Sequence, residues 1–438
     1  MSSEWLRTTL ADAPIMIMDG DRGTNYPSQD DFSQAGHCLF LNTGNVTTEG
    51  FNFSSCAFIT AEKDSVLRKG KLVRDDVVLT TRGTVGNVAY FRASVPFEHL
   101  RINSGMVILR SDQSQLSSHF LYLFLRSALF MEQVKSLQSG SAQPQLPIRD
   151  MKRIEIPIPP VHVQSGICAV LGAFDDRITL LRENNATLEA IAQALFKSWF
   201  VDFDPVRAKM EGRAPEGMGE ATAALFPDGF EESELGLVPR GWRVKPLDEV
   251  ANFLNGLALQ KFPPTDDAWL PVIKIAQLRK GDTVGADRAG RNLKPAYVIQ
   301  NGDVLFSWSG SLEVEVWCGG EGALNQHLFK VTSDTYPKWF YYLWTKHHLE
   351  HFRQIAASKA TTMGHIQRAH LSQAKAVVPP DDVVLAVGEC FAPLLDRWIA
   401  IALQAQTLAT LRDTLLPRLI SGQLRLPEAE AQVEEATA

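Results

Sequence analysis

Residues 163–200 read VQSGICAVLGAFDDRITLLRENNATLEAIAQALFKSWF, and apolar side chains recur along this stretch at heptad spacing. The first set of positions is Ile167, Phe174, Leu181, Leu188 and Leu195. The second set is Leu171, Ile178, Asn185, Ala192 and Trp199. Alternating steps of four and three residues are the spacing of a coiled-coil contact line. The stretch therefore predicts one helix, roughly 57 Å long, with an apolar stripe that must be covered.

The same stripe returns 220 residues later. The first set maps onto Val387, Leu394, Ile401, Leu408 and Leu415, and the second onto Phe391, Trp398, Ala405, Arg412 and Leu419. We call the apolar members of these four sets, apart from the two alanines, the seam. Two helices of one design can bury their stripes against each other, which predicts an antiparallel coiled-coil-like pair with pseudo-two-fold symmetry. The alternative is that each helix packs only on its own globular domain. Asn185 either fixes the register of the seam or points into solvent.

The parts that precede the two helices also repeat. Residues 76–83 (DVVLTTRG) are echoed by 303–310 (DVLFSWSG), and Pro159-Pro160 by Pro379-Pro380. Short strand-like runs alternate with turns and helices, so we predict an α/β (α+β) class with two globular domains. The expected boundaries are a first domain at 1–158, a long helix at 159–201 and an acidic Gly/Pro-containing linker at 202–240. A second domain at 241–378, a long helix at 379–424 and a disordered acidic tail at 425–438 complete the expected order.

Composition narrows the class of protein. Apolar residues make up 45% and charged residues 21% of the chain, as in ordinary globular proteins. No apolar run approaches the length of a membrane span, and five scattered cysteines fit neither a zinc site nor a disulfide framework. We therefore expect a cytoplasmic location. The net charge is −7, but acids concentrate in 202–234 and in the tail. The remaining body is slightly basic, which permits DNA binding.

Catalytic motifs are missing from the sequence. It contains no P-loop, no G-x-S-x-G and no H-E-x-x-H. The two Pro-Pro pairs are followed by Val161 and Asp381, so neither forms the signature of an amino-methyltransferase. His347 and His351 share a helix face, but no third metal ligand is evident. Asp150-Met151-Lys152 lacks the preceding acid of a nuclease site. We expect no catalytic residue and no metal site.

Polar loops at matched places are the candidate binding sites. Arg suits guanine and Asn or Gln suits adenine at base edges, while Lys and Arg meet phosphates. The candidates in the first domain are Thr80, Thr81, Arg82, Thr84, Asn103, Ser104, Ser141, Gln143 and Gln145. Those in the second are Lys274, Gln277, Ser307, Trp308, Ser309, Ser311, Asn325, Gln326, His327, Lys359, Thr361, Thr362 and His365. The alternative for any one of them is an ordinary solvated loop residue.

Several motifs then give a family resemblance. They are DGDRGTNYP at 19–27, LPVIK at 270–274, AQPQL at 142–146, FKSWFVDFDPV at 196–206, ELGLVPRGW at 234–242 and LLPRLISGQL at 415–424. With the doubled plan, these motifs resemble the specificity subunit of a type I restriction–modification system. The run at 19–27 adds Arg22, Asn25 and Tyr26 as candidate DNA-binding residues. The second domain departs from the pattern with TTMGHI at 361–366, so the two domains are expected to recognise different half-sites.

The resemblance implies a division of labour. Each globular domain would be a target recognition domain for one half of an asymmetric bipartite site on double-stranded DNA. The helices would set the spacer and dock two modification subunits, which would use S-adenosylmethionine to methylate adenine N6. Restriction subunits would use ATP and Mg to cut unmodified DNA. No cofactor would bind this chain, which would not be an enzyme by itself. The competing hypotheses are a nuclease or methyltransferase in its own right and a scaffold or decoy without DNA specificity.

Overall fold

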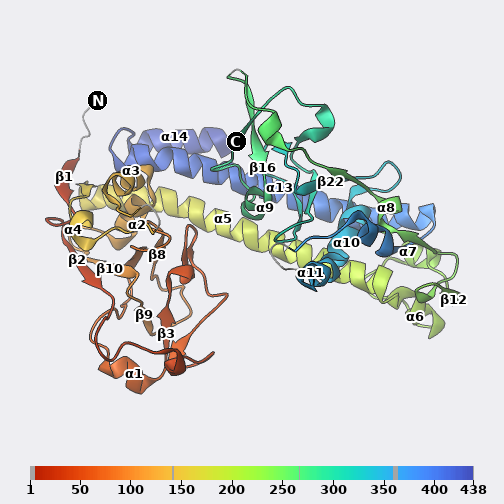
Figure 1. The fold of residues 1–438 in the computed structure, drawn as a ribbon, viewed down its shortest axis with the longest axis horizontal. Helices are drawn as coiled ribbons and strands as arrows, with labels where there is room; N and C mark the ends of the chain where they lie inside the picture. The colour runs from red at the N-terminus through yellow and green to blue at the C-terminus, as the bar shows by residue number, and fades with distance from the viewer. Residues whose placement is uncertain (1–4, 141–142, 266, 359–363, 438) are drawn as a thin grey trace. The chain divides into compact units, whose positions relative to one another are not determined.

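The computed structural model describes residues 5–140, 143–265, 267–358 and 364–437. The chain forms two compact units (Figure 1). The first unit is Met1–Arg177 with Leu408–Ala438, and the second is Ile178–Thr407. Helices α5 (Val161–Phe196) and α13 (Asp381–Ile420) each contribute a segment to both units. Each helix begins directly after a Pro-Pro pair, because proline is tolerated at a helix start but not inside one.

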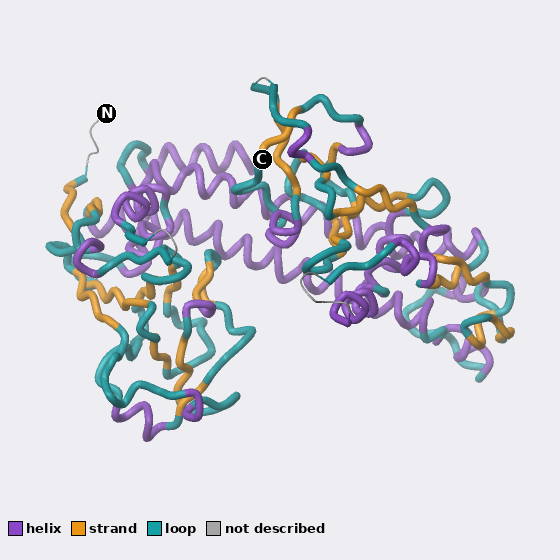
Figure 2. The backbone as a smooth tube through the Cα atoms, in the orientation of Figure 1, coloured by secondary structure: helices purple, strands orange, loops and turns teal. Residues whose placement is uncertain are grey.

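Two sheets build the globular part of the first unit (Figure 2). The larger has the order β2-β10-β7-β8, and β10 runs antiparallel to both of its neighbours. The smaller has the order β6-β3-β9, with β3 parallel to β9. Pairs β1–β11 and β4–β5 complete the strands. The bounds are β1 (Leu6–Thr9), β2 (Ile15–Asp19), β3 (Cys38–Leu41), β4 (Val46–Thr47), β5 (Gly50–Phe51), β6 (Phe58–Ile59), β7 (Val77–Thr80), β8 (Val88–Tyr90), β9 (Leu100–Ile102), β10 (Met106–Ser111) and β11 (Glu155–Ile158).

The second unit repeats the strand order of the larger sheet, the parallel pair of the smaller sheet and the pair of terminal strands. Its larger sheet has the order β15-β22-β19-β20, and the parallel pair β16–β21 recurs within the sheet β17-β16-β21-β18. Pair β14–β23 corresponds to β1–β11. The bounds are β14 (Arg243–Pro246), β15 (Asn252–Asn255), β16 (Trp269–Ile273), β17 (Arg288–Gly290), β18 (Val298–Ile299), β19 (Val304–Ser307), β20 (Val314–Val316), β21 (Gly322–Leu324), β22 (Leu328–Thr332) and β23 (Lys375–Val378).

Shorter helices lie between the strands of both units, and α2, α3 and α4 of the first correspond in order to α10, α11 and α12 of the second. In the first unit they are α1 (Ala61–Val66), α2 (Ser118–Arg126), α3 (Ala128–Leu137) and α4 (Ile148–Met151). In the second they are α8 (Leu247–Val250), α9 (Ile275–Lys280), α10 (Lys338–His347), α11 (Leu349–Ser358) and α12 (Arg368–Gln373). Single-turn helices lie at Gln29–Asp31, Thr43–Asn45, Leu259–Lys261 and Pro295–Tyr297. None of the helices in the described ranges is long and apolar enough to cross a membrane.

The repetition extends to individual hydrogen bonds. In the first unit, Asp76 accepts the main-chain N–H of Val73 at 2.8 Å and a bidentate pair of bonds from Arg110. In the second unit, Asp303 accepts the N–H of Gln300 at 2.7 Å and pairs with Lys330 at 2.6 Å. A buried carboxylate needs such partners. The two units therefore share a turn as well as a strand order.

Helices α5 and α13 pack against each other in the second unit. Asn185 on α5 donates to the carbonyl of Trp398 on α13 at 3.1 Å. Fourteen residues later, in the π-helical turn that continues α5, the Trp199 ring lies 5.5 Å from the ring of Phe391. The α13 partner moves backward as α5 advances, so the two helices are antiparallel.

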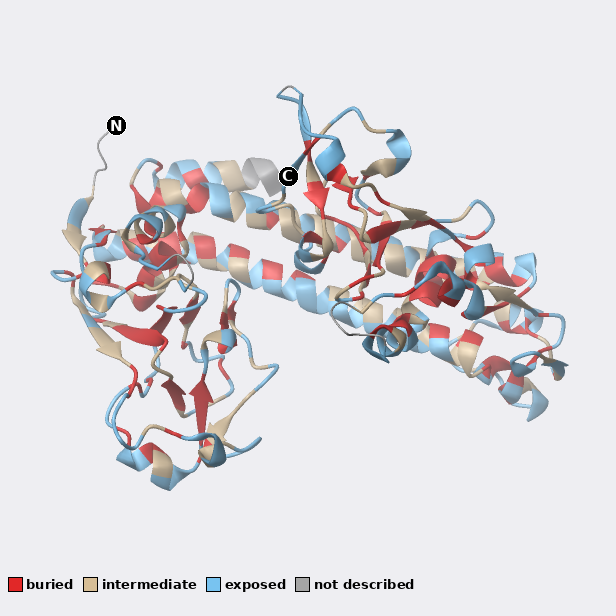
Figure 3. Ribbon diagram, in the orientation of Figure 1, coloured by how far each residue is buried: buried red, intermediate tan, exposed pale blue. Residues whose placement is uncertain are grey.

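Every member of the predicted seam is buried or half-buried. Those in the second unit are Ile178, Leu181, Leu188, Leu195, Trp199, Val387, Phe391, Leu394, Trp398 and Ile401, and those in the first are Ile167, Leu171, Phe174, Leu408, Leu415 and Leu419. Buried and half-buried segments alternate with exposed ones along both long helices (Figure 3). The aromatic core of the second unit contacts the helix pair, since Trp339 of α10 stacks on Phe391 at 4.9 Å. The helices thus pack on each other and on the globular part of the unit.

The expected linker at 202–240 has secondary structure of its own. The α5 helix ends in a π-helical turn at Lys197–Val201, and Phe203 adopts a left-handed conformation with φ of 58°. Helices α6 (Asp204–Met210) and α7 (Glu220–Leu225) and the hairpin of β12 (Phe230–Ser233) and β13 (Gly236–Pro239) follow. Apolar side chains spaced irregularly among the acids enter the core of the second unit, namely Phe203, Val206, Phe226, Val238 and Trp242.

The expectation that the tail after residue 424 is disordered is wrong. Leu426–Thr437 forms helix α14, and Ala429 on it is fully buried. Leu426 packs directly on the main chain of α5 in the first unit, because a Cβ atom on Gly166 would come within 2.4 Å of its Cδ1. Two apolar contacts thus anchor a segment whose acidic composition suggested a tail.

Candidate nucleic-acid interface

Four loops of the first unit are tied together by hydrogen bonds to main-chain carbonyls. We call residues 20–23, 80–87, 103–105 and 139–146 the first loop set; its described residues exclude 141–142. Thr81 donates from its N–H and its Oγ1 to the carbonyl of Gly105, at 2.8 and 3.0 Å. The N–H of Leu146 donates to the carbonyl of Thr81 at 2.9 Å. Arg22 Nη2 donates to the carbonyl of Ser104 at 3.4 Å.

The second unit ties matched loops in the same way. We call residues 255–257, 307–311, 325–327 and 364–366 the second loop set. Trp308 donates its N–H to the carbonyl of His327 at 3.3 Å and accepts from the N–H of Ile366 at 3.0 Å. Gln326 donates its N–H to the carbonyl of Leu257 at 2.9 Å. Loops that the sequence scatters over more than a hundred residues therefore meet at one place in each unit.

In each unit, a glycine directly after one strand allows two of these loops to approach each other closely. Gly20 follows β2, and a Cβ atom on it would lie 2.4 Å from the carbonyl oxygen of Asn103. Gly256 follows β15, and a Cβ atom on it would lie 2.2 Å from the carbonyl oxygen of Asn325. Both distances are too short for any side chain. Our sequence analysis did not single out these glycines, although their place directly after a strand in both copies was a usable signal.

The first loop set presents charged and amide groups outward. Arg82, Thr84 and Gln143 are exposed, and so is Arg22, which pairs with Asp19 at 3.1 Å. Asn103 is half-buried, and its Oδ1 accepts the N–H of Gly105 at 2.9 Å. Ser104 and Gln145 are half-buried within the loop set.

Two other first-domain candidates lie in the loop that follows Arg22. Tyr26 packs edge-on against Phe40 with 5.7 Å between ring centroids, and Asn25 donates to the carbonyl of Val66 at 3.5 Å. These two side chains support the loop.

The second loop set presents a different chemistry. Trp308 donates from Nε1 to Asn255 Oδ1 at 2.8 Å, which fixes the indole plane. His327 lies 5.7 Å from that ring, and its two nitrogens are 2.9 Å from Ser309 Oγ and 3.3 Å from Gln326 Nε2. In a neutral imidazole one nitrogen donates and the other accepts, so this ring can satisfy both contacts. Position 327 corresponds to Gly105 in the first unit, which has no side chain.

Some predicted contact residues shape the loops from inside. Thr80 and Ser307 are fully buried. Thr80 Oγ1 accepts the N–H of Asn87 at 3.0 Å and donates to the carbonyl of Thr84. Ser307 Oγ accepts the N–H of Glu313 at 2.7 Å and donates to the carbonyl of Ser311 at 2.7 Å. These hydroxyls close a matched turn in both units. The side chains of Asn325 and Thr81 are buried as well.

The remaining candidates fall into three groups. Lys274 forms an ion pair with Asp287, and the buried Gln277 accepts the Lys274 N–H at 3.3 Å, beside β16. Ser311 and His365 are exposed, and the His365 ring lies 6.5 Å from that of Trp308. Ser141, Lys359, Thr361 and Thr362 lie outside the described residues.

Within the described ranges, no group of three His, Cys, Asp or Glu side chains is placed to hold a metal ion. Burial lowers the pKa of His347, which packs beside Trp344 with 5.5 Å between ring centroids. Asp150 pairs with the exposed Arg149 and Arg153. Both features are part of ordinary packing.

Comparison with known proteins fits this doubled arrangement. The family model described as the type I restriction modification DNA specificity domain matches twice, at residues 17–190 and 239–410. The HindI specificity subunit of Haemophilus influenzae is 24% identical over 92% of this chain and 98% of its own. The MjaIX specificity subunit of Methanocaldococcus jannaschii is 26% identical over 80% of this chain and 78% of its own. The crystal structure of an S subunit from M. genitalium aligns at 15% identity with a TM-score of 0.48, covering 95% of this chain and 96% of that one. Since the family model matches most of the sequence, and matches it in both halves, the chain belongs to the type I restriction modification DNA specificity family.

Proposed function

We propose that this chain selects DNA sequence for a type I restriction–modification complex, and that each loop set recognises one half of a bipartite site. One observation carries the proposal. The same loop frame is built twice, with the same glycine approach and the same closed turn, and different side chains occupy its outer face. A constant frame with variable side chains is what two distinct base-recognition surfaces require.

The side chains suggest how each half would be recognised. Arg22 and Arg82 suit guanine edges or phosphates, and Gln143 suits adenine. The second loop set offers the fixed indole of Trp308 for apolar contact and His327 for hydrogen bonding. Identical recognition surfaces on a two-fold scaffold would prefer a palindrome. These two unlike surfaces would prefer an asymmetric site.

Catalysis is assigned to partner subunits in this proposal. The matched relatives are specificity subunits of type I restriction enzymes by name. Two modification subunits would bind the helix pair, carry S-adenosylmethionine and methylate adenine N6. Restriction subunits would use ATP and Mg to cut unmodified DNA. The chain itself would bind double-stranded DNA and supply no reacting group.

Methylation by the assembled complex tests the proposal. The complex of this chain with its modification subunits is given genomic DNA, and the methylated adenines are mapped. We expect one bipartite sequence. Arg82→Ala should relax base preference in one half only, and His327→Ala in the other half only. Arg149→Ala is the control, because Arg149 is 89% exposed by side chain and lies outside both loop sets.

Methylation that is independent of this chain would overturn the proposal. Equal loss of preference in both halves from either single substitution would contradict the assignment of one half-site to each unit. A mobility-shift assay at stated salt concentration separates a scaffold or decoy from a DNA-binding subunit, because the scaffold would not discriminate the mapped site from a scrambled duplex.

A further inference from the structure

One carboxylate in the first unit joins the globular part to both long helices. Asp175 on α5 accepts a hydrogen bond from Arg126 Nη1 of α2 at 3.0 Å and one from Arg412 Nη1 of α13 at 2.6 Å. The three side chains are only 14–20% exposed. Arg412 is the polar exception in the second copy of the heptad pattern, and this contact accounts for it.

The cluster is held in one geometry. The guanidinium of Arg126 also lies over the Tyr122 ring of its own helix, 5.1 Å from the ring centroid. Burial alone would lower the pKa of Arg412, but the charges of Asp175 and Asp413 outweigh burial and raise it. The guanidinium therefore stays charged. Half-buried ion pairs tolerate little displacement, because a separated partner becomes an uncompensated charge.

The second unit has a basic residue at the matched position. Lys346 of α10 lies 220 residues after Arg126, and its Nζ is 3.1 Å from Glu189 Oε1 on α5 and 2.9 Å from Glu315 Oε1 on β20. Burial alone would lower the pKa of Lys346, but Glu315 and Glu189 outweigh burial and raise it. The residue 220 positions after Asp175 is Leu395, so the cation is repeated while its acidic partner comes from elsewhere.

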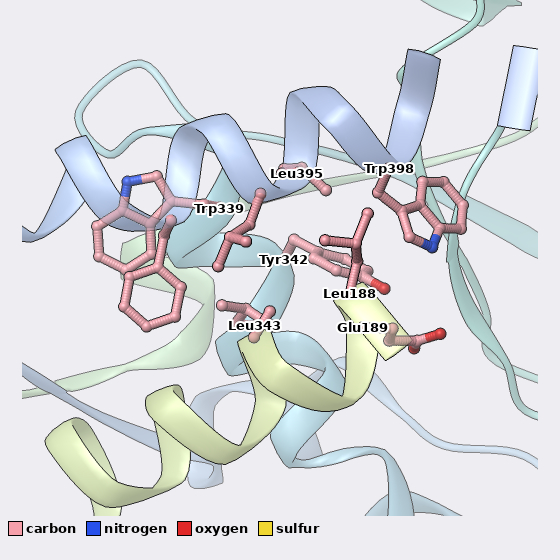
Figure 4. Close-up of a pocket in the computed structure, with 10 residues that line it drawn as sticks. Leu188, Glu189, Trp339, Tyr342, Leu343, Leu395 and Trp398 are labelled. Carbon is pink, nitrogen blue, oxygen red and sulfur yellow. The ribbon is translucent and has the colours of Figure 1, made fainter. Parts of the chain in front are cut away.

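Glu189 also borders an apolar pocket of the second unit (Figure 4). Leu188 and Glu189 approach it from α5, and α13 contributes Leu395 and Trp398. The remaining labelled lining residues, Trp339, Tyr342 and Leu343, come from α10. Apolar packing of this kind restricts separation but permits sliding. The ion pair of Lys346 with Glu189 adds a directional contact at the edge of this packing.

We infer that Arg126 and Lys346 are positioning residues, each of which fixes the angle of one recognition domain on its helices and thereby decides which spacer length the complex accepts. This inference rests on the proposed function. The loop sets would determine which bases are recognised, and the two cations would determine which distance between the half-sites is accepted.

A change in the angle between a domain and its helices would move the loop set of that domain, because the helices that carry the two cations pack on strands next to the loops. Helix α2 packs on β7 and β8, and residues 81–87 of the first loop set connect those two strands. Helix α10 packs on β20 and β22, and residues 308–311 lie just before β20. A base pair occupies about 3.4 Å along the duplex, so a tilt that moves a loop set by a few ångströms is enough to favour a spacer one base pair longer or shorter.

The test uses the complex with its modification subunits and the site mapped for the unaltered chain. Three duplexes carry both half-sites with the mapped spacer and with one base pair fewer or more. Arg126→Met should reduce discrimination against the altered spacers about tenfold or more, which corresponds to about 1.4 kcal/mol. Base preference within each half-site should stay unchanged. Arg126→Lys, which keeps the charge, should recover part of the discrimination.

The control is Arg92→Met. Arg92 Nη1 lies 3.7 Å from Asp176 Oδ1, on the residue after Asp175, but the two side chains are 53% and 76% exposed. Its spacer discrimination should equal that of the unaltered chain. Lys346→Met repeats the test in the second unit and serves if Arg126→Met fails to assemble.

Unchanged spacer discrimination in assembled complexes of Arg126→Met or Lys346→Met would overturn the inference. An altered base preference at unchanged spacer discrimination would overturn it too. Absence of sequence selectivity in the unaltered complex would instead refute the proposed function, so the two failures are distinguishable.

Discussion

Asn185 of α5 reaches across the seam and donates from Nδ2 to the main-chain carbonyl of Trp398 in α13, at 3.1 Å. Its other polar atom, Oδ1, is buried and has no hydrogen-bond partner. Of the two interpretations that the sequence left open for Asn185, the structure selects the contact inside the seam over a solvated side chain. The residue gains one hydrogen bond and leaves one acceptor unsatisfied.

Replacing Asn185 with leucine should therefore raise the free energy of unfolding by about 1 kcal/mol, because an unsatisfied buried acceptor costs about 1–3 kcal/mol and one net hydrogen bond contributes about 1 kcal/mol. Urea unfolding of the full chain measures the change. Asn184→Leu is the matched control, since Asn184 is exposed and its replacement should change stability little. A loss of stability in Asn185→Leu would mean that the bond to Trp398 outweighs the unsatisfied oxygen.

The close approach of Gly20 to Asn103 and of Gly256 to Asn325 gives a second prediction. Alanine at either position would place Cβ 2.4 or 2.2 Å from a main-chain oxygen, which cannot move aside as a flexible side chain would. Each substitution should lower the free energy of unfolding by about 1–3 kcal/mol and impair recognition of one half-site only. Gly219→Ala, with nothing within 4 Å of the added atom, is the control. Equal effects at all three positions would contradict the steric explanation.

The sequence predicted the helices and strands whose apolar residues recur at a regular spacing. The heptad positions and the Pro-Pro pairs located α5 and α13 closely, and the repeated runs at 76–83 and 303–310 contain β7 and β19. Irregular segments gave no such signal. Phe203, Phe226 and Trp242 lie among acids without any period, so their burial in the second unit depends on distant partners such as Trp199 and Phe200.

The candidate site was predicted at the level of loops, not of side chains. Composition correctly indicated polar loops at 80–86 and 307–311, and main-chain bonds bring them to the neighbouring loops. Composition cannot tell which way a hydroxyl points. Thr80 and Ser307 looked like surface groups, yet both are fully buried and bond within their own turns. Asn255, which fixes Trp308, escaped notice because one asparagine at a strand end is common.

A buried ion cluster in the first unit predicts the acid sensitivity of the chain. Asp64, with a side chain 5% exposed, accepts hydrogen bonds from Lys71 and from Arg101. Burial alone would raise the pKa of Asp64, but these bonds and charges outweigh it and lower the pKa from 3.8 to about 2. A carboxylate with a lowered folded-state pKa stabilises the fold above its unfolded pKa. That contribution, roughly 2 kcal/mol, is lost as the pH falls from 3.8 towards 2.

Asp64→Asn should accordingly lower the free energy of unfolding at neutral pH, and its difference from the unaltered chain should shrink as the pH falls below 3.8. Urea unfolding at a series of pH values between 7 and 2 measures this. Asp30→Asn, at an exposed position, is the control and should follow the unaltered chain throughout. A difference for Asp64→Asn that stays constant with pH would show that packing, and not ionisation, is responsible.

The antiparallel pairing of α5 and α13 leads to a prediction about length. One heptad inserted after Glu183 in α5 and another after Ile399 in α13 lie opposite each other, since Asn185 faces Trp398. Seven residues preserve the seam pattern and add about 10.5 Å of helix, which equals about three base pairs at 3.4 Å each. If the helices set the spacer, the mapped methylation site should keep both half-sites and gain about three base pairs between them.

The same seven residues inserted between Glu234 and Leu235, in the turn between β12 and β13, form the control. They lengthen the chain equally but leave both helices unchanged, so the spacer should stay as mapped. A spacer that is unchanged by the helix insertions in an active complex would exclude the helices as the determinant of spacing. A longer spacer in the control variant would also contradict the role of the helices, because the length of the chain, and not the length of the helices, would then determine the spacer. Insertion into one helix alone offsets the two halves of the seam, so that variant should lose stability and not acquire a new spacer.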